Sequence, residues 1–324
     1  MVDVARAAGV SLKTVSRHVN GATNIAPAYD DRIRVAIREL GYRRNLSAAS
    51  IRPGGRSGVV GVIIEDIANP FYAALVRGIE DVLGPTGSLL LSASSEGDAA
   101  RHDQLMEGLL QRQVDGLVVV PPRRQGESWA RTPNLPPVVL VDRAGPGPAT
   151  DVVLADDRGG ARTATSLLVE HGARRVGLVG DATTIATMAA RRRGYREALT
   201  RAGLQAAAVL EVTGAHTVTD ATDAVRLLLH AAHGPDALFC ANNRASLGAL
   251  HAFRITGRRL PMVGFDDFEA ATLVSPEVSV VSQDPAAMGR CAAEQLLRRI
   301  DGDTSPPVRV VLPTTLTRRG SEQP

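Results

Sequence analysis

Most of this chain alternates short, continuously apolar segments with segments of helical periodicity, and this alternation limits the folds that it can adopt. We expect strands at residues 59–64, 88–93, 116–120, 138–142, 175–180, 238–240, 262–265 and 280–281. Helical patterns occupy residues 71–83, 101–111 and 161–170. Apolar strands separated by helices form parallel sheets covered on both faces. Because a second series of strands begins near residue 175, we expect two lobes, each binding ligands at the carboxyl ends of its strands.

The N-terminal segment has a different pattern, which predicts short helices and no strand. Residues 1–20 indicate two helices joined by a turn at Gly9, where glycine allows a positive φ. Ser11 is placed to cap the second helix, and a third helix begins at Pro27 and ends near Gly41. The predicted fold class is therefore α/β: an N-terminal all-α helix-turn-helix domain followed by a two-lobed parallel α/β core.

The second helix of this segment carries side chains suited to base edges and phosphates. We predict DNA contacts from Leu12, Lys13, Thr14, Ser16, Arg17 and Asn20. Lys13 is the only lysine in the chain, whose other basic residues are arginines and histidines. Residues 1–58 contain ten Lys or Arg and four acids, a net charge of +6, whereas the whole chain has +3, which leaves −3 for residues 59–324. The positive charge is thus concentrated where DNA binding is predicted.

The composition excludes several classes of protein. Two cysteines in 324 residues are too few for a disulfide framework. The chain shows neither a signal-peptide pattern nor an apolar run of about 18 residues, so we expect a cytoplasmic protein with no membrane contact.

Sequence motifs for catalysis are also missing, so we expect no enzyme and no cofactor. The chain has no G-x-S-x-G, no P-loop and no dinucleotide motif after its first strand. Adjacent carboxylates such as Asp266 and Asp267 point to opposite faces of a strand and cannot act together on one bond. His230 and His233 lack a third ligand at a suitable spacing, so we expect no metal site.

Several motifs of the chain occur together in one known family. They are VDVARAAGVSLKTVSRHVNG, Asn69-Pro-Phe-Tyr72, Asp142-Arg143, Arg191-x-x-Gly-Tyr195, Asn242-Asn243 and Gly264-Phe-Asp-Asp267. With these motifs the chain resembles the LacI family of transcriptional regulators, the lactose and galactose repressor type, with an effector domain similar to ribose-binding proteins. The resemblance implies a DNA-binding domain at residues 1–44, a hinge helix and linker at 45–58, and an effector-binding core at 59–324. Lobe one would take about 59–172 and 285–312, and lobe two about 173–284 and 313–324.

The same resemblance implies which residues bind the effector. They are Asn69, Phe71, Tyr72, Asp142, Arg143, Arg191, Asn242, Phe265, Asp266 and Gln283. Carboxylates, amides and guanidinium groups suit sugar hydroxyls, and aromatic rings suit the C–H face of a sugar ring. Asn243 departs from the aspartate that the family usually has after the asparagine, and this exchange is expected to alter contacts between the lobes.

The function implied is that of a dimeric repressor gated by a small molecule. The hinge helix would form only when two copies meet on a pseudo-palindromic operator, with Ile51 wedged into the minor groove. A monosaccharide is the leading effector because the paired carboxylates would repel a phosphate, and a nucleoside is the alternative. A transport receptor with the same two-lobed core is the competing function. Family members usually carry a capping residue before this motif, so we also expect the native start to lie upstream of Met1.

Overall fold

The computed structural model of the protein describes residues 1–19, 22, 24–42, 56–122, 133, 135–145, 150–205 and 208–324. The chain divides into two compact units, Met1–Ser57 and Gly58–Pro324, which we call the N-terminal unit and the core unit. Among the described residues, no helix is long and apolar enough to cross a membrane.

The described part of the N-terminal unit consists of helices α1 (Val2–Ala8), α2 (Leu12–Val19) and α3 (Pro27–Glu39). Gly9 follows α1 with a φ of 60°, which lets the chain turn sharply into α2. The hydroxyl of Ser11 accepts a hydrogen bond from the backbone N–H of Thr14 at 3.1 Å. Val15 of α2 and Ile33 of α3 are fully buried in the small core that joins the helices. The predicted helix-turn-helix fold is confirmed.

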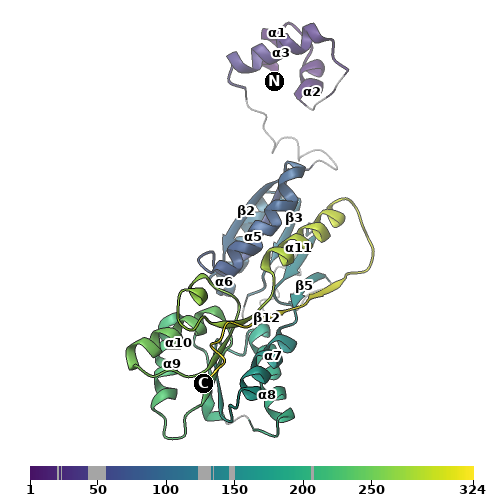
Figure 1. The fold of residues 1–324 in the computed structure, drawn as a ribbon. Helices are drawn as coiled ribbons and strands as arrows, with labels where there is room; N and C mark the ends of the chain where they lie inside the picture. The colour runs from purple at the N-terminus through teal and green to yellow at the C-terminus, as the bar shows by residue number, and fades with distance from the viewer. Residues whose placement is uncertain are drawn as a thin grey trace. The chain divides into compact units, whose positions relative to one another are not determined.

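The core unit contains two six-stranded sheets, one in each lobe (Figure 1). The strand order in lobe one is β11 (Arg309–Leu312), β5 (Asp151–Ala155), β4 (Val138–Val141), β3 (Gly116–Val119), β1 (Val59–Ile64) and β2 (Leu89–Ser94). All of its pairings are parallel. The order in lobe two is β12 (Thr315–Thr317), β10 (Ser279–Ser282), β9 (Met262–Phe265), β8 (Ala237–Cys240), β6 (Val176–Gly180) and β7 (Glu211–Thr213). Only β12 runs antiparallel to its neighbour, β10, in the described part of this sheet.

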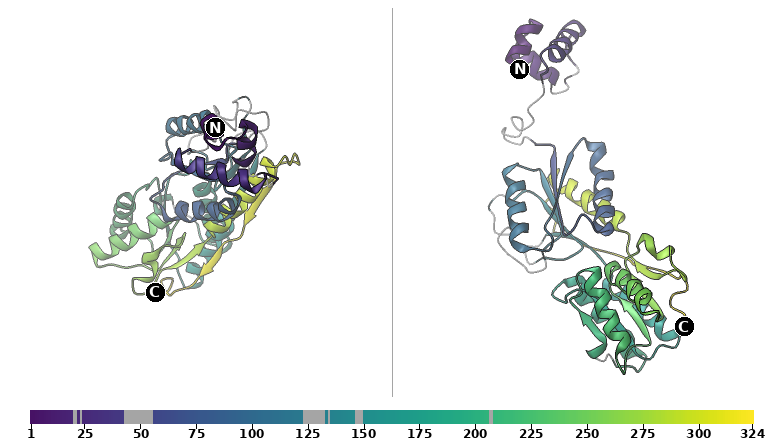
Figure 2. Two further views of the ribbon diagram at one scale, coloured as in Figure 1. Left: turned by 90° about the horizontal axis from the view of Figure 1, so that it is seen from above. Right: turned by 90° about the vertical axis from the view of Figure 1, so that its left-hand side faces the viewer.

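Helices cover both faces of each sheet, as the apolar strands predict (Figure 2). Lobe one has α5 (Pro70–Leu83) and α11 (Pro285–Ile300) on one face and α6 (Ala99–Gln111) on the other. Lobe two has α7 (Asp157–Glu170) and α8 (Ala186–Arg201) on one face, and α9 (Val218–His230) and α10 (Asn243–Thr256) on the other. Short 3₁₀ helices span Gly84–Thr86, Ala208–Leu210 and Glu269–Thr272.

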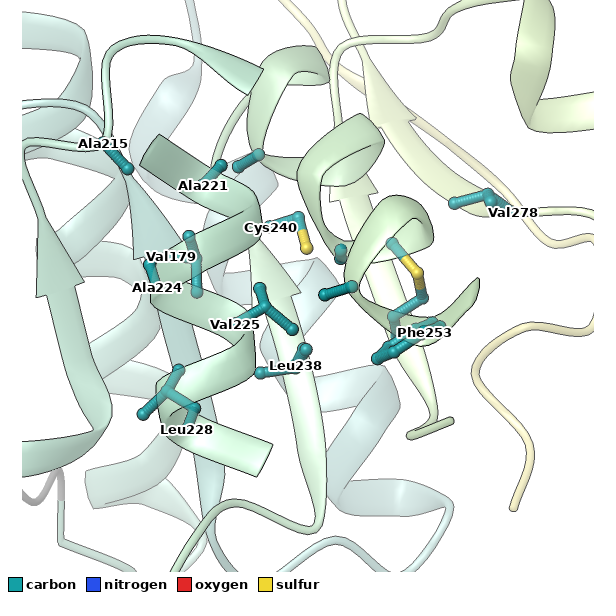
Figure 3. Packing of buried hydrophobic residues seen from close by; sticks show 14 of the residues in the cluster. Val179, Ala215, Ala221, Ala224, Val225, Leu228, Leu238, Cys240, Phe253 and Val278 are labelled. Atoms are coloured by element: carbon teal, nitrogen blue, oxygen red, sulfur yellow. The ribbon is translucent and has the colours of Figure 1, made fainter. Parts of the chain in front are cut away.

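The cores beneath these helices are built from aliphatic side chains. Figure 3 shows one of them, where Val225 and Leu228 of α9 lie beside Leu238 and Cys240 of β8 and Phe253 of α10 completes the cluster. The central strands of both sheets, β1, β3, β4, β6, β8 and β9, contain only apolar residues and glycine, and several charged residues directly follow their ends.

The chain passes between the lobes after β5, after β10 and after β11. The first passage corrects the predicted lobe boundary near residue 172. Helix α7 packs against α8 and the sheet of lobe two, with Ala161, Ala164 and Leu168 buried beside Phe239. The first segment of lobe one therefore ends near Ala155, because the apolar face of α7 packs on the second sheet and not on the first.

Close packing of α5 on α11 generates a prediction for lobe one (Figure 1). A Cβ built on Gly78 of α5 would lie 2.1 Å from the carbonyl oxygen of Ala286. Because backbone atoms cannot yield as a flexible side chain can, Gly78→Ala should lower the free energy of unfolding by about 1–3 kcal/mol. Gly84→Ala is the control, since a Cβ there meets nothing within 4 Å. Equal urea midpoints for the two variants would contradict this account of the helix contact.

Candidate functional site

The strand ends of both lobes border one cavity of about 60 Å³. This is the position at which open parallel sheets bind ligands. Its lining residues are Glu65, Asn69, Phe71, Tyr72, Asp142, Arg143, Asp181, Ile185, Thr187, Met188, Arg191, Asn242, Arg244, Asp266 and Gln283. Charged and amide side chains dominate this set, in contrast to the apolar cores on either side.

Asp142 and Asp266 occupy equivalent places in the two lobes. Each directly follows a strand, Asp142 after β4 and Asp266 after β9. Both have a positive φ, 69° for Asp142 and 65° for Asp266. Aspartate adopts this conformation more readily than most residues, and strained backbone of this kind gathers at functional sites. Each lobe thus uses the same sharp turn at the end of a strand that carries a carboxylate.

In lobe one, Asp142 belongs to a buried hydrogen-bonded group. Arg143 donates to Asp142 Oδ2 at 3.1 Å, to the hydroxyl of Tyr72 at 2.9 Å and to the carboxylate of Glu65. The Tyr72 hydroxyl in turn donates to Asp142 Oδ2 at 3.3 Å. Burial raises the pKa of Asp142 because desolvation penalises the charged form, and Arg143 opposes that shift. The network holds these side chains in one arrangement before any ligand contacts them.

In lobe two, the guanidinium of Arg191 has a similar central position. It donates to Asp157 Oδ1 at 2.7 Å, to the carbonyl oxygen of Ala241 at 2.8 Å and to both oxygens of Asp266 at 3.2 Å. Its Cζ lies 3.7 Å from the centroid of the Phe265 ring. Gln283 also donates to Asp266 Oδ1, at 2.8 Å. Arg191 therefore orients Asp266 from one side and Gln283 from the other.

Asp157 lies behind Arg191 and does not line the cavity. Burial raises the pKa of Asp157 to about 7, because Arg191 offsets only part of the cost of desolvation and the charge of Asp142 adds to it. This carboxyl group therefore titrates near neutrality, unlike an aspartate in water. Its protonation would remove one of the two acidic partners of Arg191.

All of the sequence-predicted effector residues line this cavity except Phe265. The prediction that Phe265 presents its ring to a ligand is wrong, since its side chain is fully buried beneath Arg191 in the α7–α8 core. Asn69 and Asn242 also serve as helix caps, accepting hydrogen bonds from the backbone N–H groups of Phe71 and Ala245. Because their side-chain oxygens are used in these caps, it is their amide NH₂ groups that can donate hydrogen bonds to a ligand.

Sequence reasoning missed several residues of the cavity. Glu65 directly follows β1 and Asp181 directly follows β6, so their position at the carboxyl ends of strands is a signal that could have found them. Ile185, Thr187 and Met188 come from the start of α8, where no polar motif marks them. Among the described residues, no group of His, Cys, Asp and Glu is arranged to hold a metal ion.

Direct contacts join the lobes beside the cavity. Arg244 of α10 forms an ion pair with Asp66, which follows β1 in lobe one. Asn243 Nδ2 donates to Asn69 Oδ1 at 2.9 Å. Because the same Asn69 oxygen accepts from the N–H of Phe71, its orientation is set by the helix cap and Asn243 must be the donor. Asn243, at a position where the family usually has aspartate, therefore donates a hydrogen bond that an ionised aspartate could not donate.

The candidate DNA surface lies on α2. Leu12, Lys13 and Arg17 are exposed, and Thr14 and Ser16 are half-buried. Arg17 donates to the carbonyl oxygen of Asn24 at 3.1 Å, so its guanidinium is already oriented by the segment after α2. His18 Nδ1 contacts Asp30 Oδ1 at 2.5 Å and ties α2 to α3. The predicted DNA contacts Asn20 and Ile51 lie outside the described residues.

Two family models match separate parts of the chain. Residues 1–45 match a family model described as "Bacterial regulatory proteins, lacI family", and residues 165–322 match one described as "Periplasmic binding protein-like domain". The chain is 34% identical to the HTH-type transcriptional regulator CelR of Thermobifida fusca, over 98% of this chain and 96% of that protein. It is 32% identical to the ribose operon repressor of Escherichia coli, over 99% of both.

A solved structure is similar along the whole chain as well. It is described as a transcriptional regulator CelR–cellobiose complex and superposes with a TM-score of 0.76. The two chains are 33% identical, and the match covers 98% of each.

The pKa of Asp157 predicts a pH effect on stability. Its folded value of about 7 exceeds the value of about 3.9 in an unfolded chain, so the folded state holds an extra proton between these pH values. The resulting stabilisation is complete below about pH 4 and is lost as the pH rises through about 7. Asp157→Asn removes this titration. Its free energy of unfolding should therefore rise relative to wild type, by on the order of 2 kcal/mol, between pH 5 and pH 8. Urea titrations check this against Asp223→Asn, an exposed control, and parallel profiles for all three proteins would exclude it.

Proposed function

Because the chain belongs to the LacI family of bacterial regulatory proteins, we propose that it represses transcription from one class of operator and that a sugar-like effector controls this repression. The family consists of DNA-binding transcription regulators and not of enzymes. We assign residues 1–44 to DNA binding, 45–58 to the hinge and linker, and 59–324 to effector binding. A role as a transport receptor is not favoured, because the lacI-family match covers the helix-turn-helix segment.

The single observation that supports a sugar effector is the matched pair of strand-end carboxylates, Asp142 and Asp266, each held by a buried arginine. These groups accept hydrogen bonds from hydroxyls, and the neighbouring arginines and amides donate to ring and hydroxyl oxygens. The cavity lining also includes Glu65 and Asp181, so carboxylates outnumber its arginines and an anionic ligand would be repelled. A neutral, hydroxyl-rich molecule meets both requirements.

The relatives agree with this chemistry. The CelR structure is described as a complex with cellobiose, and the Escherichia coli relative is named as the repressor of a ribose operon. We therefore propose a monosaccharide unit in the cavity, with a nucleoside as the alternative because its ribose would make the same contacts.

A ligand in this cavity would contact both lobes at once and so favour the arrangement in which they are close together. We propose that two chains act as a dimer on a pseudo-palindromic operator in the cytoplasm, and that effector binding weakens their hold on DNA. Coupling of this kind requires only that the effector bind one arrangement of the lobes better than the other.

A thermal-shift screen against neutral sugars and sugar phosphates tests the chemistry of the ligand. We expect a neutral sugar to raise the melting temperature of the full chain and to lower its affinity for an operator selected from random palindromic DNA. A response to sugar phosphates alone would overturn the proposed effector class.

The Asp266→Asn substitution should separate sugar binding from operator binding. Asparagine tolerates the positive φ at this position but lacks the charge that pairs with Arg191 and accepts sugar hydroxyls. We expect the sugar found in the screen to bind this variant more weakly by about 1–3 kcal/mol in calorimetry. Operator affinity without the sugar should stay within twofold of wild type. Unchanged sugar binding in both Asp266→Asn and Asp142→Asn would remove the basis of the site assignment.

Lys13 should contribute to sequence readout. It is exposed on α2 one turn before Arg17, a spacing that lets both side chains enter the major groove. Lys13→Ala should cost about 1–3 kcal/mol on the selected operator and less on random DNA. Anisotropy titrations at fixed salt measure both. Equal losses on the two DNAs would mean that Lys13 contacts only phosphates.

A further inference from the structure

A second and larger cavity adjoins the one described above. Its volume is about 400 Å³, which falls within the range of about 300–1,000 Å³ typical of small-molecule sites. The first cavity, at about 60 Å³, offers less space in this arrangement of the lobes. The lining residues of the second are Pro70, Phe71, Ala74, Asp266, Asp267, Phe268, Glu269, Thr272, Ser282, Gln283, Pro285 and Arg319. Most of the space beside the carboxylate pair is therefore on this side.

Three residues, Phe71, Asp266 and Gln283, line both cavities, so the two cavities adjoin each other. Gln283 is 7% exposed and donates its amide N–H to Asp266. Its Oε1 is buried and has no hydrogen-bond partner among the described residues. Since an unsatisfied buried acceptor costs free energy, a ligand donor that reached this oxygen would be stabilising.

The chemistry of the second cavity differs from that of the first. Its walls include the apolar side chains of Pro70, Phe71, Phe268 and Pro285. Arg319 is the one basic residue among its described lining residues, and it is already paired with Asp267 through hydrogen bonds of 2.8 and 2.6 Å. Asp266 and Glu269 add further negative charge. The cavity thus suits a neutral ring with an apolar face and disfavours a phosphate.

We propose that the effector carries a second neutral ring, attached to the sugar unit that contacts Asp142 and Asp266, and that this ring occupies the adjoining cavity with a donor aimed at Gln283. The inference rests on the proposed function and narrows the ligand from a free monosaccharide to a two-ring molecule. The second ring is a sugar in a disaccharide or a base in a nucleoside, and both present flat apolar faces and neutral hydrogen-bonding groups.

Calorimetry with matched ligand pairs tests this on the full chain. The pairs are D-glucose with cellobiose, D-xylose with xylobiose, and D-ribose with adenosine. We expect one two-ring member to bind at least tenfold more tightly than its single-ring partner. Preference within the first two pairs identifies a disaccharide, and preference within the third identifies a nucleoside.

A substitution that fills only the second cavity provides an independent test. Ala74 lines this cavity and not the first, so Ala74→Phe should weaken binding of the preferred two-ring ligand at least tenfold. Binding of its single-ring partner should stay within twofold. Ala73→Phe is the matched control, because Ala73 is the exposed neighbour on the same helix and lines neither cavity.

Other outcomes separate this inference from the proposed function. Single-ring ligands that bind as tightly as their two-ring partners in every pair would overturn the inference and leave a sugar-gated repressor in place. An unchanged affinity of Ala74→Phe for the two-ring ligand would also overturn it. If no member of the panel binds and the wider screen finds no neutral sugar, the proposed function fails together with the inference.

Discussion

The geometry of the core depends most on the hydrogen bonds and ion pairs of the Arg191 guanidinium group. It joins the start of α7, the end of β8 and the end of β9 through Asp157, Ala241 and Asp266, and it covers the ring of Phe265. Removing one partner from a buried ion pair typically costs about 3–5 kcal/mol, because the other charge is left unpaired. A neutral side chain in place of Arg191 could not donate hydrogen bonds to two carboxylates and a carbonyl oxygen at once. Arg191 is thus needed both for the fold of lobe two and for the orientation of Asp266.

Lobe one also orients a strand-end aspartate with a buried arginine, but its arginine comes from a different place in the chain. Arg143 follows its carboxylate directly in the chain, whereas Arg191 is brought to Asp266 from a separate helix. In both lobes an arginine holds an aspartate whose strand-end turn has a positive φ. Two rigid half-sites that face each other can detect a bridging molecule, because the ligand satisfies both only when the lobes stand at one separation. That is a physical basis for control of DNA binding by a small molecule.

The parts of this architecture that depend on local pattern could be predicted from sequence. Apolar strands alternating with helices indicated two sheets, and motifs that resemble a known family indicated Asp142 and Asp266. The prediction that Phe265 contacts the ligand was wrong. The alternation of side chains along a strand does not show that an arginine from another helix will cover the ring. The lobe of α7 was also assigned wrongly, since neither proline nor glycine marks the passage at Ala155. Contacts such as Asp66 with Arg244 depend on how far apart the lobes stand, and no local pattern encodes that distance.

The contact between Asn69 and Asn243 shows how one helix cap can influence the separation of the lobes. The cap of α5 fixes the orientation of the Asn69 amide, which presents its oxygen toward lobe two. An ionised aspartate at position 243 would place a carboxylate against that oxygen, and the lobes would have to move apart or admit water. Asparagine instead donates a hydrogen bond and supports the ion pair of Asp66 with Arg244 beside it. The close arrangement of the lobes is therefore stabilised by the protein's own side chains, so an effector needs to supply only the remaining difference in free energy between the two arrangements.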